Sequence, residues 1–458
     1  MNTLFDIPKH SETPPRTIPN QDANPGQGNP EGAHTKERNT LMNTPNLTPT
    51  TPQAQRLHDI FAHSTPLEAI QTYARAAKIA PLACLIMAIH ETLGHTTPTV
   101  TLDAGRGPGS LNLFSCITGP SGAGKSLVQN RGRKAITLTG TGWTKPLTMG
   151  TGSGEGLIAA LDPNTEGNTG SGLLIESEIT NLGELMNRSG STFRQVATKA
   201  FTGETLAINN KKERVCVEES TYRFGMSVGV QPEHSDVILA HGDQGFPQRF
   251  VWVGTTDPLR ERGKDYGTPR PYTIDISKYK DSHTIHGCDE QVRTLQEHSD
   301  RVLIDGDTDG LNGHAFFTRS KIAAALSIIR GHNNTTGDDW RRAGLIMEES
   351  DHQREQCQRK ANEKNAIKEA ELQENREVAN QIAHDKKRER IANLILTKVG
   401  EGDKKRNAAY SWGNLRKTFA SRDRQEMDEV FDALLEEGLV SGGSGSHVTP
   451  GPNWRETY

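Results

Sequence analysis

The segment that most constrains this 458-residue chain is the run Gly119–Ser126, which reads GxxxxGKS. It follows the apolar run Leu111–Thr118, so a strand, a glycine turn and a helix opening at Lys125 are expected in that order. Glycines let backbone N–H groups converge on an anion, and a helix N-terminus adds about half a positive charge. The spacing therefore predicts a phosphate-binding loop formed by Gly119, Pro120, Ser121, Gly122, Ala123, Gly124, Lys125 and Ser126.

Two side chains of this loop carry specific chemistry. Lys125 can reach the β- and γ-phosphates of a nucleotide, and the Ser126 hydroxyl can ligate the Mg²⁺ that bridges them. The alternative is a chance match in a chain with 45 glycines, and the preceding strand argues against it. We expect ATP and Mg²⁺ as the bound groups.

Composition limits the class of protein. A hydrophobic content of 33% is low for a wholly globular chain, so part of it should be tail or linker. A net charge of −4 gives no general case for nucleic acid, so any DNA-binding surface must be local. Five scattered cysteines without a CxxC pair, no signal-peptide pattern and no membrane-length apolar run favour a cytoplasmic protein without a membrane partner.

The pattern along the chain predicts separate parts. Residues 1–55 should be a disordered tail, and 56–350 a nucleotide-binding domain that begins with helices. Within that domain, 258–310 is interpreted as a polar insertion and 314–350 as helical. Residues 351–390 should form a solvated, charged helical linker, because no apolar heptad runs through them to make a coiled coil.

Strands and helices alternate after the loop. A helix is expected over Lys125–Ile136 and another over Thr192–Phe201, with strands at Leu173–Ile175, Arg223–Val230 and Arg249–Val253. This alternation predicts an α/β domain, a P-loop NTPase core with a mostly parallel sheet and flanking helices.

The C-terminal part, 391–458, reads as a separate winged helix. Three helices are expected, the second capped by Ser411, and a glycine-tipped hairpin follows and ends at His447–Val448. Its basic residues are candidates for DNA contact, although the interleaved acids Asp423 and Glu426 leave a plain solvated face as an equal alternative. These basic residues are Arg416, Lys417, Arg422 and Arg424.

Two acids follow the strand at Leu173–Ile175 and are candidates for the chemistry of hydrolysis. Side chains alternate along a strand, so Glu176 and Glu178 would face the same way. We assign Glu178 to orienting the attacking water and Glu176 to the metal side, with a solvated acidic pair as the alternative. Ser177 stands where an Asp is common.

Two further polar residues lie next to predicted strands. Gln231 ends the strand Arg223–Val230 and could contact the γ-phosphate or the water, although a plain strand end is as consistent. Arg249 lies between a glycine turn and a strand. It could stabilise the charge that builds on a neighbouring subunit's phosphates, or it could form a structural salt bridge.

The chain resembles a family of P-loop ATPases from phages, plasmids and integrative elements of actinobacteria, described as helicases, primase-helicases or proteins of unknown function. The resemblance covers roughly residues 60–350. Besides the loop, it rests on five groups of residues: Ser153–Ile158, Glu176–Glu178, Ser191–Gln195 with Ala200–Phe201, Gly245–Phe246 with Arg249–Trp252, and Asp338–Ala343. The resemblance implies that a Glu-x-Glu ending of this strand, as at Glu176–Glu178, is a trait of the family. It also implies that Arg249 is the arginine finger of the family.

Two functions of different classes are compatible with these features. The first is a ring-forming ATPase that moves along or remodels single-stranded or duplex DNA, a replicative helicase of a mobile element. The resemblance implies a homo-oligomer, with a hexamer as the expected form. The alternative is an initiator or regulator that binds duplex DNA through the winged helix, recruits other replication proteins and unwinds nothing. A metabolic kinase would not explain the arginine turn or the C-terminal part.

Overall fold

The computed structural model describes residues 51–140, 145–209, 214–240, 245–306, 312–406 and 410–454. The predicted disordered tail lies outside these residues except for its end. There the helix α1 (Pro52–Phe61) begins, with the Thr51 hydroxyl accepting a hydrogen bond from the Ala54 amide at 3.1 Å. The N-terminal boundary of the folded part is therefore a few residues earlier than the sequence suggests.

Five parallel strands form the central sheet, in the order β4-β5-β8-β2-β9. All six residues of β2 are buried, as expected of a central parallel strand that is covered on both faces. This arrangement confirms the predicted α/β class and parallel sheet. The strands are β2 (Leu113–Thr118), β4 (Leu147–Met149), β5 (Ser171–Glu176), β8 (Arg223–Val230) and β9 (Phe250–Gly254).

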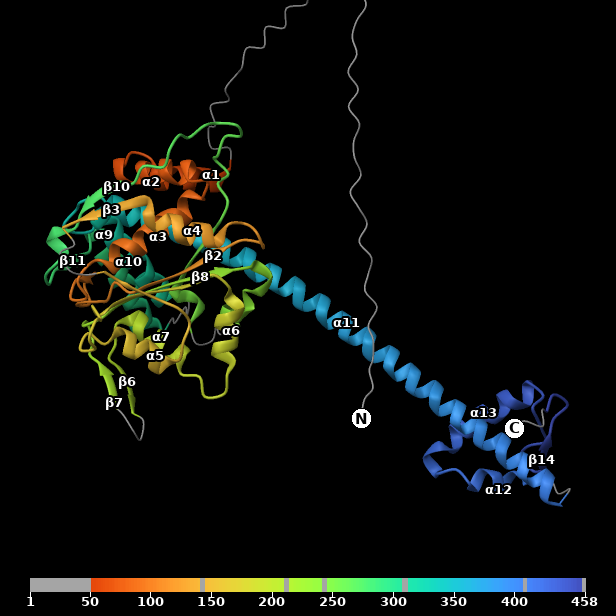
Figure 1. The fold of residues 1–458 in the computed structure, drawn as a ribbon. Helices are drawn as coiled ribbons and strands as arrows, with labels where there is room; N and C mark the ends of the chain where they lie inside the picture. The colour runs from red at the N-terminus through yellow and green to blue at the C-terminus, as the bar shows by residue number, and fades with distance from the viewer. Residues whose placement is uncertain are drawn as a thin grey trace, which may run out of the picture. The chain divides into compact units, whose positions relative to one another are not determined.

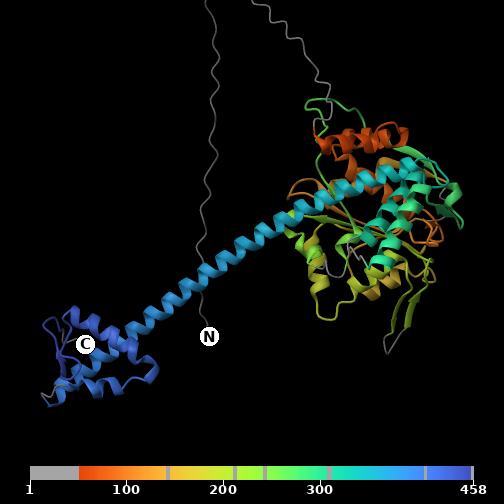
Figure 2. The same cartoon turned by 180° about the vertical axis from the view of Figure 1, so that it is seen from behind.

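Alternate residues of β2 point into two different cores. Leu113 and Ile117 pack among helices on one face, and Phe114 and Cys116 pack among helices on the other. The two helical layers are visible above and below the sheet in Figure 1 and from behind in Figure 2. One layer contains α1, α2 (Thr65–Ala76), α3 (Pro81–Gly94) and α10 (Asn312–Ile329), and the other contains α5 (Gly154–Leu161), α6 (Ile179–Asn187) and α7 (Phe193–Thr202).

Among the described residues, no single helix is long and apolar enough to cross a membrane. The consecutive helices α2 and α3 reach the required length and apolarity only when taken together, and they are bent by 117°. Nearly every residue of α3 is buried inside the protein.

The helix after the glycine loop is shorter than predicted. Helix α4 spans Lys125–Gly132, a short 3-10 turn follows, and Ile136 already begins strand β3 (Ile136–Thr139). Gly132 lies against α3, where a Cβ would be 2.7 Å from the Cβ of Met87. The periodicity of the sequence shows neither this close approach of α4 and α3 nor the strand that begins at Ile136.

The region interpreted as an insertion, 258–310, contains regular elements that pair with distant strands. Strand β10 (Tyr272–Asp275) pairs with β3, and β11 (Thr284–His286) pairs with β1 (Thr101–Asp103), both in parallel. Helix α9 follows at Asp289–Asp300. The remaining described elements include the hairpin β6 (Leu206–Asn209) and β7 (Arg214–Val217), and the short helix α8 (Asp236–Leu239).

The Asp338–Ala343 run forms the start of helix α11. The Thr336 hydroxyl accepts from the Asp339 amide at 3.2 Å, and the Asp339 carboxylate accepts from the Thr336 amide at 2.9 Å, which is a capping box. Arg342 is 2% exposed and donates to the carbonyl of Ile60 at 2.7 Å. This run therefore joins α11 to α1.

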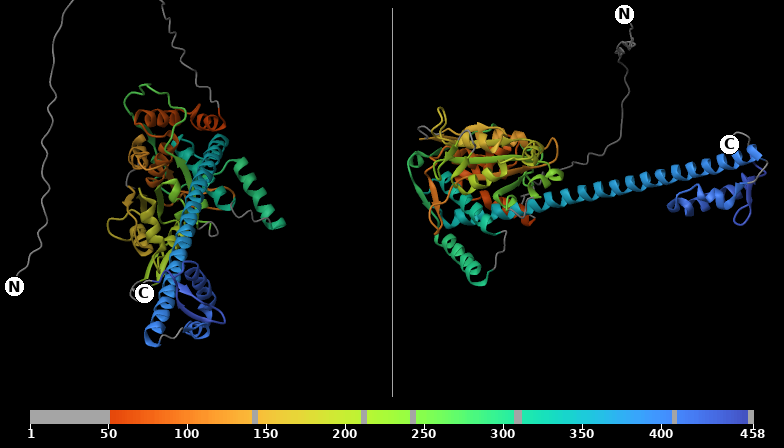
Figure 3. Two further views of the ribbon diagram at one scale, coloured as in Figure 1. Left: turned by 90° about the vertical axis from the view of Figure 1, so that its right-hand side faces the viewer. Right: turned by 90° about the horizontal axis from the view of Figure 1, so that it is seen from below.

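A single helix, α11 (Gly337–Arg406), replaces the three segments that the sequence suggests. Figure 3 shows its continuous course. Neither Gly nor Pro occurs from 345 to 399, so nothing in the backbone interrupts it. Its first part is core, because Cys357 and Ala361 are 0% and 1% exposed, whereas every residue from 362 to 386 is exposed.

The C-terminal part of α11 packs with two helices and a small antiparallel sheet of order β12-β14-β13. The predicted cap is confirmed, because the Ser411 hydroxyl accepts from the Asn414 amide at 3.3 Å. Ile395 and Phe431 are among its core residues. The elements are α12 (Trp412–Lys417), α13 (Arg424–Glu436), β12 (Tyr410–Ser411), β13 (Val440–Ser441) and β14 (His447–Pro450).

Candidate active site

The glycine loop lies between β2 and α4 and needs its glycines for two different reasons. Gly122 and Gly124 have φ values of +76° and +79°, a region that side-chain-bearing residues rarely adopt. At Gly119 the limit is space, since a Cβ would lie 2.4 Å from Thr255 Oγ1 and 3.0 Å from the Ala123 Cβ. The Gly119 amide itself donates to the Val230 carbonyl at 3.0 Å. The loop is therefore fixed to the sheet at its first residue.

Lys125 is folded into this loop. Its ammonium donates to the carbonyls of Gly119 at 2.9 Å and Pro120 at 3.0 Å, and the residue is 7% exposed. Ser126 follows it and is exposed in the first turn of α4. The loop thus places a cation and a hydroxyl at one helix N-terminus, where the helix dipole also favours an anion.

The strand order brings the predicted acids to the same edge of the sheet as the loop. Strand β8 lies between β2 and β5, with Thr118 opposite Val230 and Glu176 opposite Val228. Parallel strands have their carboxyl ends at one edge, so the loop after β2, the acids after β5 and Gln231 after β8 meet there. Ligands of parallel α/β sheets bind at this edge.

Glu178 and Gln231 are in contact. The Gln231 Nε2 donates to the Glu178 Oε2 at 3.4 Å, and the Glu178 side chain is exposed at the start of α6. Gly229 makes this approach possible, since a Cβ there would lie 2.3 Å from the Ser177 carbonyl oxygen. A solvent-accessible carboxylate and an amide are thus paired beside the glycine loop.

Glu176 has a different environment from Glu178. It is 8% exposed, and its carboxylate accepts three hydrogen bonds: from the Glu178 amide at 3.0 Å, Asn181 Nδ2 at 3.2 Å and Thr151 Oγ1 at 3.1 Å. These bonds hold the turn between β5 and α6 against the end of β4. Glu176 therefore orients the segment that carries Glu178, and its assignment to the metal side stays a prediction.

Sequence reasoning missed three residues of this network, namely Thr151, Asn181 and Gln129. Gln129 on α4 is 1% exposed, and its Nε2 donates to the carbonyls of Glu176 and Ser227, each at 3.2 Å. It therefore ties the helix behind the loop to β5 and β8. A polar residue one turn after the lysine, on the face that packs against the sheet, is the signal that could have identified it.

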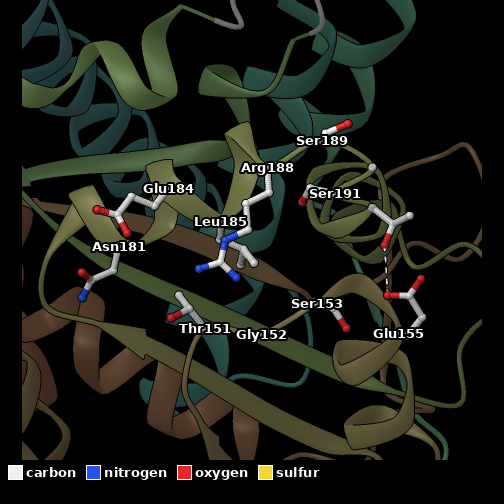
Figure 4. A pocket seen from close by; sticks show the side chains of 12 residues that line it. Thr151, Gly152, Ser153, Glu155, Asn181, Glu184, Leu185, Arg188, Ser189 and Ser191 are labelled. Atoms are coloured by element: carbon white, nitrogen blue, oxygen red, sulfur yellow. Dashed lines mark hydrogen bonds between the residues drawn. The ribbon is translucent and has the colours of Figure 1, made fainter.

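A polar cavity of about 480 Å³ adjoins the Glu176 network. Thr151 and Asn181 line it, and both also bind Glu176. In Figure 4 the Arg188 guanidinium extends toward Thr151, and Glu155 lies on the far side. The Glu155 carboxylate accepts a hydrogen bond from the Thr192 hydroxyl at 3.3 Å. The other lining residues are Gly152, Ser153, Glu184, Leu185, Ser189, Gly190 and Ser191.

Arg249 lies at the amino ends of the parallel strands, whereas the glycine loop lies at their carboxyl ends. It ends a 3-10 turn just before β9, whose first residue Phe250 is opposite Phe114 near the start of β2. It is 6% exposed, its Nη1 donates to the Gly245 carbonyl at 2.6 Å, and its guanidinium lies over the Phe201 ring. Burial lowers the pKa of this guanidinium. Arg249 therefore does not belong to the loop's own site.

The chain was compared with known proteins. No protein-family model matches it, and the curated proteins contain no match either. The interpretation of the site therefore depends on the loop, on the strand order and on the side chains described above.

Proposed function

We propose that this chain is a P-loop ATPase that acts as a DNA motor, the replicative helicase of a phage, plasmid or integrative element. The observation that carries the ATPase part is the meeting of the Lys125 loop with the Glu178–Gln231 pair at one edge of a parallel sheet. A cation for the phosphates and a carboxylate for the water are what phosphoryl transfer to water requires. Two features support the proposed action on DNA. One is the family resemblance, and the other is the C-terminal module of three helices and a hairpin, which we propose is a winged helix.

Each residue has a role in this proposal. Lys125 exchanges its two carbonyl acceptors for the β- and γ-phosphate oxygens of ATP. Glu178 accepts a hydrogen bond from the attacking water and takes its proton as the bond from the water oxygen to the γ-phosphorus forms; the bond from the γ-phosphorus to the β–γ bridging oxygen breaks, and that oxygen leaves with ADP. Gln231 holds Glu178 in place and contacts the water or the γ-phosphate. Glu176 keeps the turn that carries Glu178 fixed to β4.

The loop fits a magnesium nucleotide, because positive-φ glycines and an exposed hydroxyl open the first turn of α4. Ser126 and, through water, Glu176 are the residues that would hold the ion. Mg²⁺ would neutralise charge that develops on the phosphate oxygens.

The proposed action on DNA is tested by measuring the ATPase rate with and without single-stranded DNA. We expect single-stranded DNA to raise the rate of the full chain. A chain shortened after Ala370 keeps the buried start of α11, so it should retain the basal rate and lose DNA affinity. An unstimulated rate, together with specific duplex binding and no strand displacement, would favour the initiator alternative.

Arg249→Ala is expected to leave ATP binding intact and to lower hydrolysis by about 10³-fold. The reason is that Arg249 and the glycine loop of the same subunit lie at opposite ends of the strands. Arg249 is therefore placed to contact a phosphate bound by a neighbouring subunit. Because the side chain is buried over Phe201, this role requires it to move out in the assembled ring.

Mixing Arg249→Ala with Lys125→Ala tests action between subunits. Each variant lacks a different half of a shared site, so some mixed interfaces regain both halves and hydrolysis should recover above either variant alone. Melting temperatures serve as the control. A loss of activity that follows a lower melting temperature and shows no recovery in mixed rings would assign Arg249 a structural role.

A further inference from the structure

The third helix of the C-terminal module is acidic. Helix α13 carries one arginine against five carboxylates: Glu426, Asp428, Glu429, Asp432 and Glu436. Three of these, Glu429, Asp432 and Glu436, follow one another at helical spacing on its exposed face. In winged helices that read duplex DNA, the corresponding helix enters the major groove. Here such an approach would place carboxylates against phosphates.

Two of the four basic residues predicted for DNA contact are already engaged within the module. Arg416 donates to both carboxylate oxygens of Asp428, at 3.0 and 2.7 Å. Arg424 donates to the Phe419 carbonyl at 3.4 Å. Asp428 therefore neutralises Arg416, the Phe419 carbonyl holds Arg424, and Lys417 and Arg422 are the more open members of the predicted cluster.

A different surface of the module concentrates positive charge. A cavity of about 520 Å³ lies between α11 and the 3-10 turn Ser421–Asp423. Its lining contains four cations and one acid. The lining residues are Ala383, Lys386, Lys387, Arg390, Arg422 and Asp423.

The single acid of this cavity is already paired. Lys387 Nζ lies 2.8 Å from Asp423 Oδ1 and also bridges to Glu426. The hydrogen bond from Lys387 lowers the pKa of Asp423, and the bonds to the two carboxylates raise the pKa of Lys387. Asp423 is thereby satisfied internally, and its contact to Arg422 is longer, at 3.8 Å.

Three cations of the cavity remain available to a ligand. Arg422 is 87% exposed, and Lys386 and Arg390 are exposed one helical turn apart on α11. Among the residues that the structure describes, neither Lys386 nor Arg390 forms an ion pair. Ala383, one turn before Lys386, leaves room beside them.

We propose that this cavity, the α11 cation seat formed by Lys386, Arg390 and Arg422, binds the phosphate backbone of DNA. The seat rests on the proposed function as a DNA-acting ATPase, and it assigns the contact to α11 instead of α13. Three lysine and arginine side chains around one cavity recognise phosphates without reading bases, so the contact is sequence-independent.

The test is DNA binding by the full-length chain at several salt concentrations. Fluorescence anisotropy of a labelled oligonucleotide, single-stranded and duplex, compares the wild type with a triple variant, Lys386→Ala, Arg390→Ala and Arg422→Ala. Loss of three phosphate contacts should reduce the slope of log K against log[salt] by about 2.7 for duplex or about 2 for a single strand. Which of the two slopes changes identifies the form of DNA that occupies the seat.

A matched control removes three other exposed cations of α11 that lie outside the module: Arg359→Ala, Lys368→Ala and Arg376→Ala. The control should keep the wild-type slope, and both variants should keep the wild-type melting temperature and basal ATPase rate. Wild-type binding by the seat variant, or an equal loss in the control, would overturn the seat while leaving the DNA motor intact. No DNA binding and no DNA-stimulated ATPase in the wild type would contradict both.

Discussion

Lys125→Ala is expected to reduce ATP hydrolysis by about 10²-fold or more and to weaken ATP binding. Lys125 is the only side-chain cation within the Gly119–Ser126 loop, and in the structure it is oriented by the carbonyls of Gly119 and Pro120. Removing a preorganised donor from a site where charge develops costs about 2.7–4 kcal/mol in comparable enzymes. Steady-state hydrolysis and binding of a fluorescent ATP analogue measure the two effects separately.

A control for this substitution is available nearby. Lys134 lies in the 3-10 turn after α4 and is exposed, so Lys134→Ala removes the same charge without touching the loop. It should hydrolyse ATP at the wild-type rate. Wild-type hydrolysis by Lys125→Ala would show that the GxxxxGKS loop is not a nucleotide site.

Glu178→Gln is expected to retain ATP and to lower hydrolysis by about 10²–10⁴-fold, the usual contribution of a general base. The amide keeps the shape of the carboxylate and its place beside Gln231, but it cannot take a proton from water. Single-turnover hydrolysis and a direct measurement of bound ATP separate the chemical step from binding. The variant should therefore accumulate bound, unhydrolysed nucleotide.

The matched control is Glu219→Gln, an exposed glutamate in the turn before β8, at the other end of that strand from Gln231. It should behave as the wild type. If Glu178→Gln hydrolyses ATP at the wild-type rate while Glu176→Gln does not, the roles assigned to the two acids are reversed.

The strands that periodicity predicts well are those with buried apolar runs. Arg223–Val230 is predicted with the bounds of β8, because both faces of that strand are covered and valine, phenylalanine and methionine alternate along it with small residues. The short strands β10 and β11 were missed, since each is held by pairing with a strand more than a hundred residues earlier in the chain. No local pattern records such a partner.

The candidate site likewise has a local feature that the sequence predicts and long-range contacts that it does not. The glycine loop is local, so its spacing alone predicts it. The Glu178–Gln231 contact depends on β5 and β8 being neighbours, which the strand order shows and the sequence does not. Similarly, Glu176 and Glu178 are alike in sequence but differ in burial, because only Glu176 is enclosed by Thr151 and Asn181.

The uninterrupted exposure of residues 362–386 has a mechanical consequence. Without buried side chains, this span of α11 is stabilised mainly by its backbone hydrogen bonds and by neighbouring pairs such as Gln373–Glu377 and Gln381–Asp385. Such pairs contribute about 0.2–0.5 kcal/mol each. Longer-range contacts lie near its two ends, where Lys364 contacts His234 and His384 contacts Glu426. The helix in this span is therefore stabilised less by packing than the buried parts of α11, and its helix–coil balance depends on temperature and on the helical segments at either end. Residues 362–386 are therefore the part of α11 where melting of the helix is expected to begin.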